Sequence, residues 1–120
     1  MSLNLRWHGL FNCDVDVVRQ EVEPRGGVYR LMSRGEDGKF RTFYVGESQN
    51  LQERLVAHFF GSEPNKRLRK ILETKDCRFK FAYVDTEQRR LGVERYLIDL
   101  LPDLVNDQTP EEAPIEVNLT

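Results

Sequence analysis

The sequence predicts an α+β chain organised around one hairpin. In residues 26–46, two apolar runs flank a turn rich in Gly and Asp, and this pattern is typical of a β-hairpin because the turn needs residues that tolerate positive φ. Residues 78–84 alternate between polar and apolar side chains, which predicts a third strand. Apolar residues recur at helical spacing between and after these strands, so we expect helices in those segments.

Length and composition predict one domain. The chain has 120 residues, 39% hydrophobic and 32% charged, which suits a single modest core. Cys13 and Cys77 stand apart from any CxxC or Cys/His cluster, and this favours a reduced, cytoplasmic (intracellular) protein. No apolar run approaches the roughly 20 residues that cross a bilayer, and the N-terminus lacks a signal core, so we expect neither a membrane partner nor export.

Three segments follow from this organisation. Residues 1–24 are expected to be an N-terminal extension packed on the core, with a strand or covering loop at 1–12 and a helix at 14–22. Residues 25–107 form the main domain. Residues 108–120 are an acidic tail, expected to be loose except for a short final strand. The net charge of −2 argues against coating nucleic acid by bulk charge, so any such surface must be local.

Tyr29 and Tyr44 are predicted to share one face of the hairpin. A loop at residues 37–38 places Tyr44 opposite Leu31, whereas a loop at 36–37 places it opposite Tyr29. Side chains alternate between faces, so either register sets the two phenols on the same side. The pair is therefore either a site or ordinary aromatic packing on a half-buried sheet.

The helix predicted after the hairpin carries two polar residues beside its apolar stripe. Asn50 followed by Glu53 is a variant capping box, which starts this helix, and Gly61 ends it. At about 100° per residue, Arg54 and His58 are neighbours on the side of the core leucines. A cation there needs a partner, or else both residues lie at the edge of the stripe and reach solvent.

A second helix, predicted at residues 64–74, carries the densest positive charge. Pro64 suits its first turn. Such a run is usually a solvated face, and here it is also the best phosphate-contacting surface for nucleic acid. The residues concerned are Lys66, Arg67, Arg69 and Lys70.

A last helix, predicted at residues 87–101, places Glu94 inside a broad apolar arc. A carboxylate in that position costs several kcal/mol unless it is paired, protonated or bound to a cation. Glu94 is therefore either a functional group or the buried partner of Arg54.

In this order, the features resemble the GIY-YIG endonuclease superfamily over residues 25–107. The two signature tripeptides appear as Gly27-Val28-Tyr29 and Tyr44-Val45-Gly46, with valine in place of isoleucine in both. The resemblance implies a nuclease domain with a small three-stranded antiparallel sheet flanked by helices. It also implies catalytic roles for Tyr29, Tyr44, Arg54, His58 and Glu94, and supporting roles for Gly27, Gly46 and Asn106.

The activity implied by the resemblance is hydrolysis of DNA phosphodiester bonds with a single Mg²⁺ or Mn²⁺. Glu94 would hold the metal ion. Tyr29 would activate the attacking water, directly or through Tyr44, with a nearby cation favouring the phenolate. Arg54 would stabilise the pentavalent phosphate, and His58 would orient a tyrosine or relay a proton.

A non-catalytic nucleic-acid or protein-binding module on the same fold is the alternative. The complete residue set favours the enzyme, because a binding module has no need for it. The acidic net charge favours the module, or a nuclease that takes its specificity from a protein partner or a homodimer. If the tripeptides occur by chance in an unrelated α+β domain, Tyr29, Arg54 and Glu94 should lie in separate regions.

Overall fold

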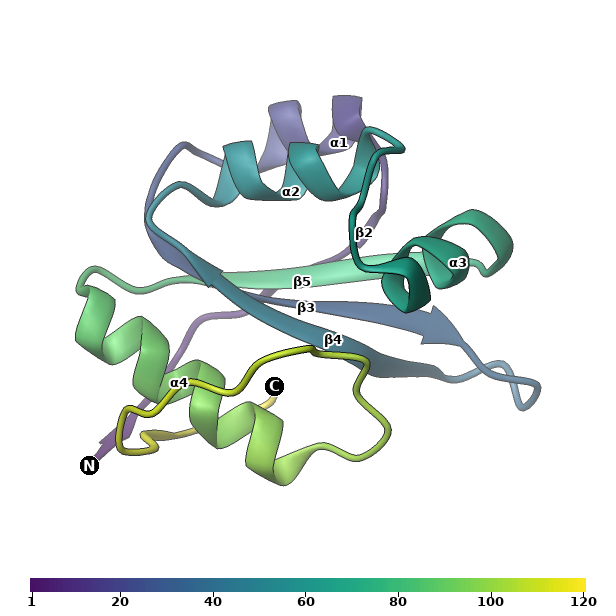
Figure 1. Cartoon of the computed structure of the whole chain (residues 1–120). Coiled ribbons are helices and arrows are strands. Elements are labelled where there is room, and N and C mark those ends of the chain that lie inside the picture. Colours follow the sequence, from purple (N-terminus) through teal and green to yellow (C-terminus); the bar gives the residue numbers. More distant parts are fainter.

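The computed structural model describes residues 1–120 and has an α+β fold built on a four-stranded antiparallel sheet (Figure 1). The strands lie in the order β2-β5-β3-β4. They are β2 (His8–Asn12), β3 (Gly27–Arg34), β4 (Phe40–Ser48) and β5 (Cys77–Tyr83). The helices are α1 (Val15–Glu21), α2 (Leu51–Phe59), α3 (Lys66–Thr74) and α4 (Glu87–Leu100). None of these helices is long and apolar enough to span a bilayer.

The sheet has one strand more than the three predicted. β2 pairs with β5 in an antiparallel arrangement, with Phe11 opposite Phe79. The pairing is irregular between His8 and Phe11, and Gly9 has a φ of 140°. A strand with this irregularity lacks the strict alternation that identifies strands in a sequence, which explains why the segment was ambiguous between strand and loop.

Helices cover both faces of the sheet (Figure 1). On one face, α1, α2 and α3 enclose a core that contains Tyr29, Leu55 and Phe81. On the other face, α4 packs over a core that contains Val28 and Val45. Consecutive strand residues point to opposite faces, so each tripeptide contributes a valine to one core and a tyrosine to the other.

The hairpin register near the tyrosines matches a loop at residues 37–38. Leu31 lies opposite Tyr44, and Tyr29 lies opposite Gly46. A β-bulge then shifts the register between Leu31 and Met32, and Phe43 has no direct partner on β3. The prediction that the two tyrosines share a face is confirmed, because their ring centroids lie 6.3 Å apart.

Side-chain caps set the helix starts. The Asn50 side chain accepts a hydrogen bond from the backbone N–H of Glu53 at 3.1 Å, as the capping box predicts. Asn65 caps α3 in the same way, so this helix begins at Lys66 and Pro64 lies outside it. The expected start of α3 at Pro64 was therefore wrong, because Asn65 caps the helix one residue later.

The C-terminal segment is packed against the body of the protein, contrary to the expectation of a loose tail. The predicted final strand is β6 (Glu116–Val117), which pairs in parallel with β1 (Ser2–Leu3). The Asn118 side chain bonds both the N–H and the C=O of Leu5, at 2.7 and 2.8 Å. Ile115 is buried over Gly92, so alternating apolar residues anchor this otherwise acidic end.

Candidate active site

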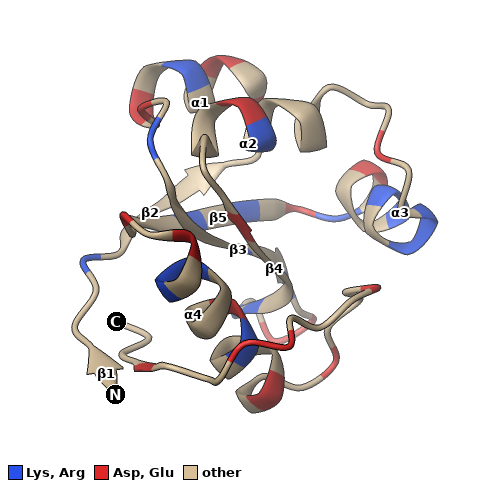
Figure 2. Cartoon of the chain, turned by 60° about the vertical axis from the view of Figure 1, so that its left-hand side comes forward, with Lys and Arg blue, Asp and Glu red and all other residues tan.

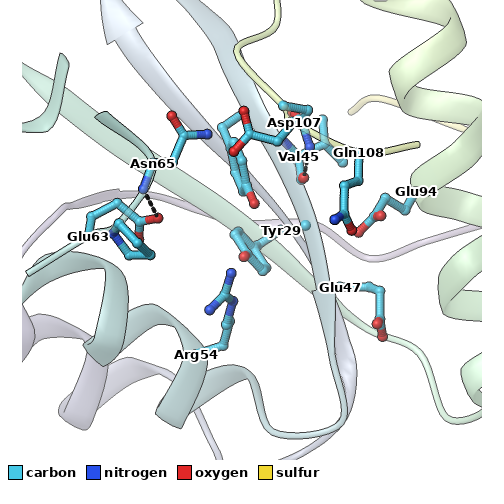
Figure 3. Close-up of a pocket in the computed structure, with 13 residues that line it drawn as sticks. Tyr29, Val45, Glu47, Arg54, Glu63, Asn65, Glu94, Asp107 and Gln108 are labelled. Atoms are coloured by element: carbon cyan, nitrogen blue, oxygen red, sulfur yellow. Dashed lines mark hydrogen bonds between the residues drawn. The ribbon is translucent and has the colours of Figure 1, made fainter. Parts of the chain in front are cut away.

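A pocket of about 390 Å³ brings together side chains from both sides of the sheet (Figure 3). Six predicted site residues line it: Tyr29, Tyr44, Gly46, Arg54, Glu94 and Asn106. His58 lies directly behind Tyr29. An unrelated domain with chance tripeptides would have separated Tyr29, Arg54 and Glu94, and the structure places them in one pocket.

Tyr29 belongs to a buried chain of three polar groups. Its hydroxyl lies 2.6 Å from Nε2 of His58, and Nδ1 of His58 lies 2.7 Å from Oε2 of Glu63. The three residues are 1%, 1% and 5% exposed. Buried polar groups are costly unless hydrogen-bonded, and here each of the three is bonded within the chain. Both ends of the chain, Tyr29 and Glu63, line the pocket.

Burial controls the protonation of Tyr29. Desolvation raises the pKa of its hydroxyl far above the usual range, Tyr44 acts in the same direction, and Arg54 lowers it only in part. Figure 3 shows the Arg54 guanidinium pointing toward Tyr29. The effect of burial on the Tyr29 pKa is thus larger than the opposing effect of the neighbouring cation, which was expected to favour the phenolate. Tyr29 therefore keeps its proton, and it needs a proton acceptor if it is to act as a base.

Glu94 enters the pocket from α4. Its pKa is raised to about 7, mainly by burial and secondly by the negative charge of Glu47. Arg90 fixes Glu47, donating from Nε to Oε2 at 3.0 Å. None of the chain's ion pairs joins Glu94 to Arg54, so the structural alternative of a buried pair is absent.

The lining of the pocket includes oxygen atoms of the kind that a hard divalent cation binds. Glu47, Glu94 and the loop residues Asp107 and Gln108 all offer oxygen atoms to the pocket. No group of three or more His, Cys, Asp or Glu residues is arranged so that it could hold a metal ion. Mg²⁺ commonly binds one or two carboxylates and keeps several of its waters. Burial disfavours the ionised form of a carboxylate, and a nearby cation favours that form.

Asn106 and Gly46 shape the pocket around Tyr29. The Asn106 side chain accepts from the Val45 N–H at 3.0 Å and donates to the Val45 carbonyl at 2.7 Å, which copies the pairing of a strand residue. At Gly46, a Cβ atom would overlap the Tyr29 ring. At Gly27, a Cβ atom would instead overlap the Ala82 carbonyl, so this glycine serves packing beneath the site.

The four basic residues of α3 lie beside the pocket and do not line it. Lys66, Arg67 and Lys70 are exposed, and Figure 2 shows this charge gathered on α3. Arg69 is partly engaged, with Nε 3.9 Å from Glu73. Because α3 begins directly after Asn65, a lining residue, the first turn of this helix lies next to the pocket.

Sequence reasoning missed five polar lining residues. They are Glu47, Glu63, Asn65, Asp107 and Gln108. Glu47 directly follows the second tripeptide, so its place at the end of a site strand was a usable signal. The other four lie outside helices and strands, where no periodicity indicates which side chains turn inward.

Fold and site together define a GIY-YIG domain, and the chain belongs to that superfamily. A family model described as a UvrC-like GIY-YIG domain matches residues 25–102, which is more than half of the chain. Protein C of the UvrABC system from Nitrosococcus oceani is 30% identical over 95 residues. That alignment covers 79% of this chain and only 15% of the relative. No solved structure matches.

Proposed function

We propose that the chain is a metal-dependent DNA endonuclease that hydrolyses phosphodiester bonds. Membership of a nuclease superfamily supports nuclease activity in general. The observation that carries the proposal is the convergence of Tyr29, Arg54 and Glu94 on one pocket, with His58 hydrogen-bonded to the tyrosine. In-line attack by water on phosphate needs a proton acceptor and positive charge near the phosphate. The phenol with its imidazole partner can supply the first, and the guanidinium and a cation at the Glu94 carboxylate can supply the second.

In the proposed reaction, Tyr29 and His58 move the proton of the attacking water. The phenol oxygen takes that proton as its own proton passes to Nε2 of His58, 2.6 Å away. Arg54 faces the same space and offers a planar fork of N–H donors to the phosphate oxygens as negative charge grows. The phosphorus–oxygen bond to the leaving group then breaks.

Glu94, with Glu47 beside it, would hold the divalent ion, Mg²⁺ or Mn²⁺. When bound, such an ion supplies positive charge beside the phosphate and the departing oxygen. The Glu94 carboxylate needs that charge, because burial and the second carboxylate disfavour its ionised form. Arg90 keeps Glu47 in place through the 3.0 Å bond.

DNA is the proposed substrate, with α3 as the phosphate-contacting surface. Lysine and arginine contacts to phosphate position a duplex without reading its sequence. Specificity is therefore proposed to come from a protein partner or from a homodimer. The relative's name makes it one component of a UvrABC system, which supports DNA repair as the setting and a partner protein as its companion.

The test is nicking of supercoiled plasmid by pure protein with Mg²⁺, with Mn²⁺ and with EDTA. Glu94→Ala is the control for contaminating nuclease. The proposal expects nicking that needs a divalent ion and disappears in Glu94→Ala. Nicking that persists in Glu94→Ala would show that Glu94 has no part in the mechanism. Absence of nicking with both metal ions would contradict the proposal that the chain is an endonuclease.

A binding module without catalytic activity is the second candidate, and the charge of the pocket favours it. Four acidic residues line the pocket, Glu47, Glu63, Glu94 and Asp107, against one basic residue, Arg54. Without a metal ion, this excess of negative charge opposes entry of phosphate into the pocket, so such a module would bind DNA through α3 and leave it uncut. Salt-dependent DNA binding without cleavage in any metal would establish the module.

A further inference from the structure

We propose that Glu63 is a positioning residue of this site, whose carboxylate holds His58 in the one tautomer able to accept the Tyr29 proton. The inference rests on the proposed function for its catalytic meaning, although the tautomer itself can be measured without any reaction. It assigns a role to a residue that carries no family signature and lies in the loop between α2 and α3.

The hydrogen-bond chemistry fixes the direction of the chain. A carboxylate accepts hydrogen bonds only, and a neutral imidazole carries one N–H. With Oε2 of Glu63 2.7 Å from Nδ1, the proton of His58 lies on Nδ1 and is donated to Glu63. Nε2 is then an acceptor, and it faces the Tyr29 hydroxyl at 2.6 Å. The other tautomer would set a donor against that hydroxyl and leave Nδ1 without a proton for Glu63.

The surroundings keep His58 neutral before reaction. Burial and the Arg54 guanidinium lower its pKa to about 4, and Glu63 only partly opposes them. A neutral imidazole has one unprotonated nitrogen that can accept a proton, and the lowered pKa means that its charged form needs a stabilising partner. Once it takes the Tyr29 proton, the imidazolium is a buried charge, and Glu63 is the carboxylate bonded to it.

Glu63 is itself held in place by the start of α3. Its second oxygen, Oε1, accepts the backbone N–H of Asn65 at 3.3 Å, as Figure 3 shows. Asn65 caps α3 through the N–H of Leu68 at 3.1 Å and donates to the Val105 carbonyl at 3.1 Å. The carboxylate therefore has both oxygens bonded, and the turn 63–65 joins the phosphate-contacting helix to the proton acceptor.

The proton balance of the step is complete. The oxygen of water bonds to phosphorus, and one of its protons goes to the Tyr29 oxygen while the Tyr29 proton goes to Nε2 of His58. The bond from phosphorus to the leaving oxygen breaks, and that oxygen takes a proton from solvent water. The proton held on His58 then returns through Tyr29 to the hydroxide left in solvent, which restores the starting state. Glu63 keeps its contact with Nδ1 through the step and stabilises the imidazolium, as an orienting carboxylate does for other histidine bases.

The first arm of the test is the tautomer of His58 by ¹⁵N NMR on metal-free and DNA-free protein. The chain has two histidines, so a His8→Gln variant assigns the signals. The proposal expects the proton on Nδ1 at pH 7, and expects Glu63→Ala to abolish that preference. A proton on Nε2 in the wild-type chain would overturn the proposal, whether or not the chain cleaves DNA.

The second arm is single-turnover cleavage by Glu63→Gln and Glu63→Asp, with folding checked by circular dichroism. Glutamine keeps the shape and loses the charge, whereas aspartate keeps the charge and shortens the side chain. If the carboxylate positions His58, the cleavage rate of Glu63→Gln should be at least about tenfold below that of wild type. Glu63→Asp should cleave faster than Glu63→Gln, and both variants should bind DNA as wild type does. If the role were packing alone, the order would reverse.

Glu73→Gln is the matched control, because Glu73 lines the same small cavity behind His58 and its side chain is 61% exposed. It is expected to cleave like wild type. Equal cleavage rates in Glu63→Gln and wild type would contradict the role of Glu63 without contradicting the proposed nuclease activity. If wild type cleaves nothing, the proposed function fails, and the tautomer still decides whether Glu63 positions His58.

Discussion

Replacing Glu94 by glutamine should make the metal-free protein more stable at pH 8, even though the same change is expected to abolish cleavage. The pKa of Glu94 is raised from 4.5 to about 7, first by burial and second by Glu47. The folded state therefore favours the protonated carboxyl. Ionisation adds no penalty below pH 4.5, an increasing one as the pH rises toward 7, and the full penalty above 7.

The size of the effect follows from that difference in pKa. At about 1.4 kcal/mol per tenfold change, the full penalty on the free energy of unfolding would be about 3 kcal/mol. Glu94 lines an open pocket and is only partly buried, so solvent reduces the expected value to about 1–2 kcal/mol. Glutamine has nearly the same shape and cannot ionise, so it removes the penalty.

Urea unfolding of both proteins at pH 4 and pH 8, in EDTA, measures this difference. The free energy of unfolding of Glu94→Gln should be larger than that of wild type at pH 8 and equal to it at pH 4. Added Mg²⁺ should then raise the midpoint of wild type at pH 8 and leave Glu94→Gln unchanged, since an ion that binds only the folded state stabilises it. A variant no more stable than wild type at pH 8 would refute the reasoning about burial.

Three further variants test the shape and charge of the site. Gly46→Ala should lower the free energy of unfolding in urea by about 1–3 kcal/mol and reduce cleavage, because its Cβ would overlap a tyrosine ring. Asn106→Ala removes two hydrogen bonds to the strand backbone and should cost about 1–3 kcal/mol in the same assay, with an unchanged midpoint refuting the bracing role. The double variant Lys66→Ala with Arg67→Ala should weaken DNA binding uniformly across sequences and lower the salt slope by about 1–2, whereas Arg19→Ala on α1 should change neither.

Local signals made much of the fold predictable. The Gly- and Asp-rich turn indicated the hairpin, and alternation at 78–84 indicated β5. Asn50 and Glu53, three positions apart, indicated the start of α2, and Asn50 does cap that helix. Parity along the strands predicted that both tyrosines share a face, but this holds only because the β-bulge shifts the register: continued from the turn, where Arg34 lies opposite Phe40, it would have separated them.

The features that the sequence did not predict depend on contacts between distant segments of the chain. β2 becomes a strand by pairing with β5 across most of the chain, and its irregular register hides this in the sequence. The tail is fixed by Asn118 bonding to Leu5 near the other end of the chain. Glu63 is buried only because its loop folds back over His58, and no spacing rule describes such a loop.

Single-turnover cleavage of a short DNA duplex by wild type and Tyr29→Phe tests the central claim most directly. Phenylalanine keeps the buried ring and removes only the hydroxyl that lies 2.6 Å from His58. Positioned proton transfer typically contributes a factor of about 100 or more. We expect Tyr29→Phe to lose at least that factor in rate, with its fold and DNA affinity unchanged, and a Tyr29→Phe protein that cleaves as fast as wild type would contradict the account.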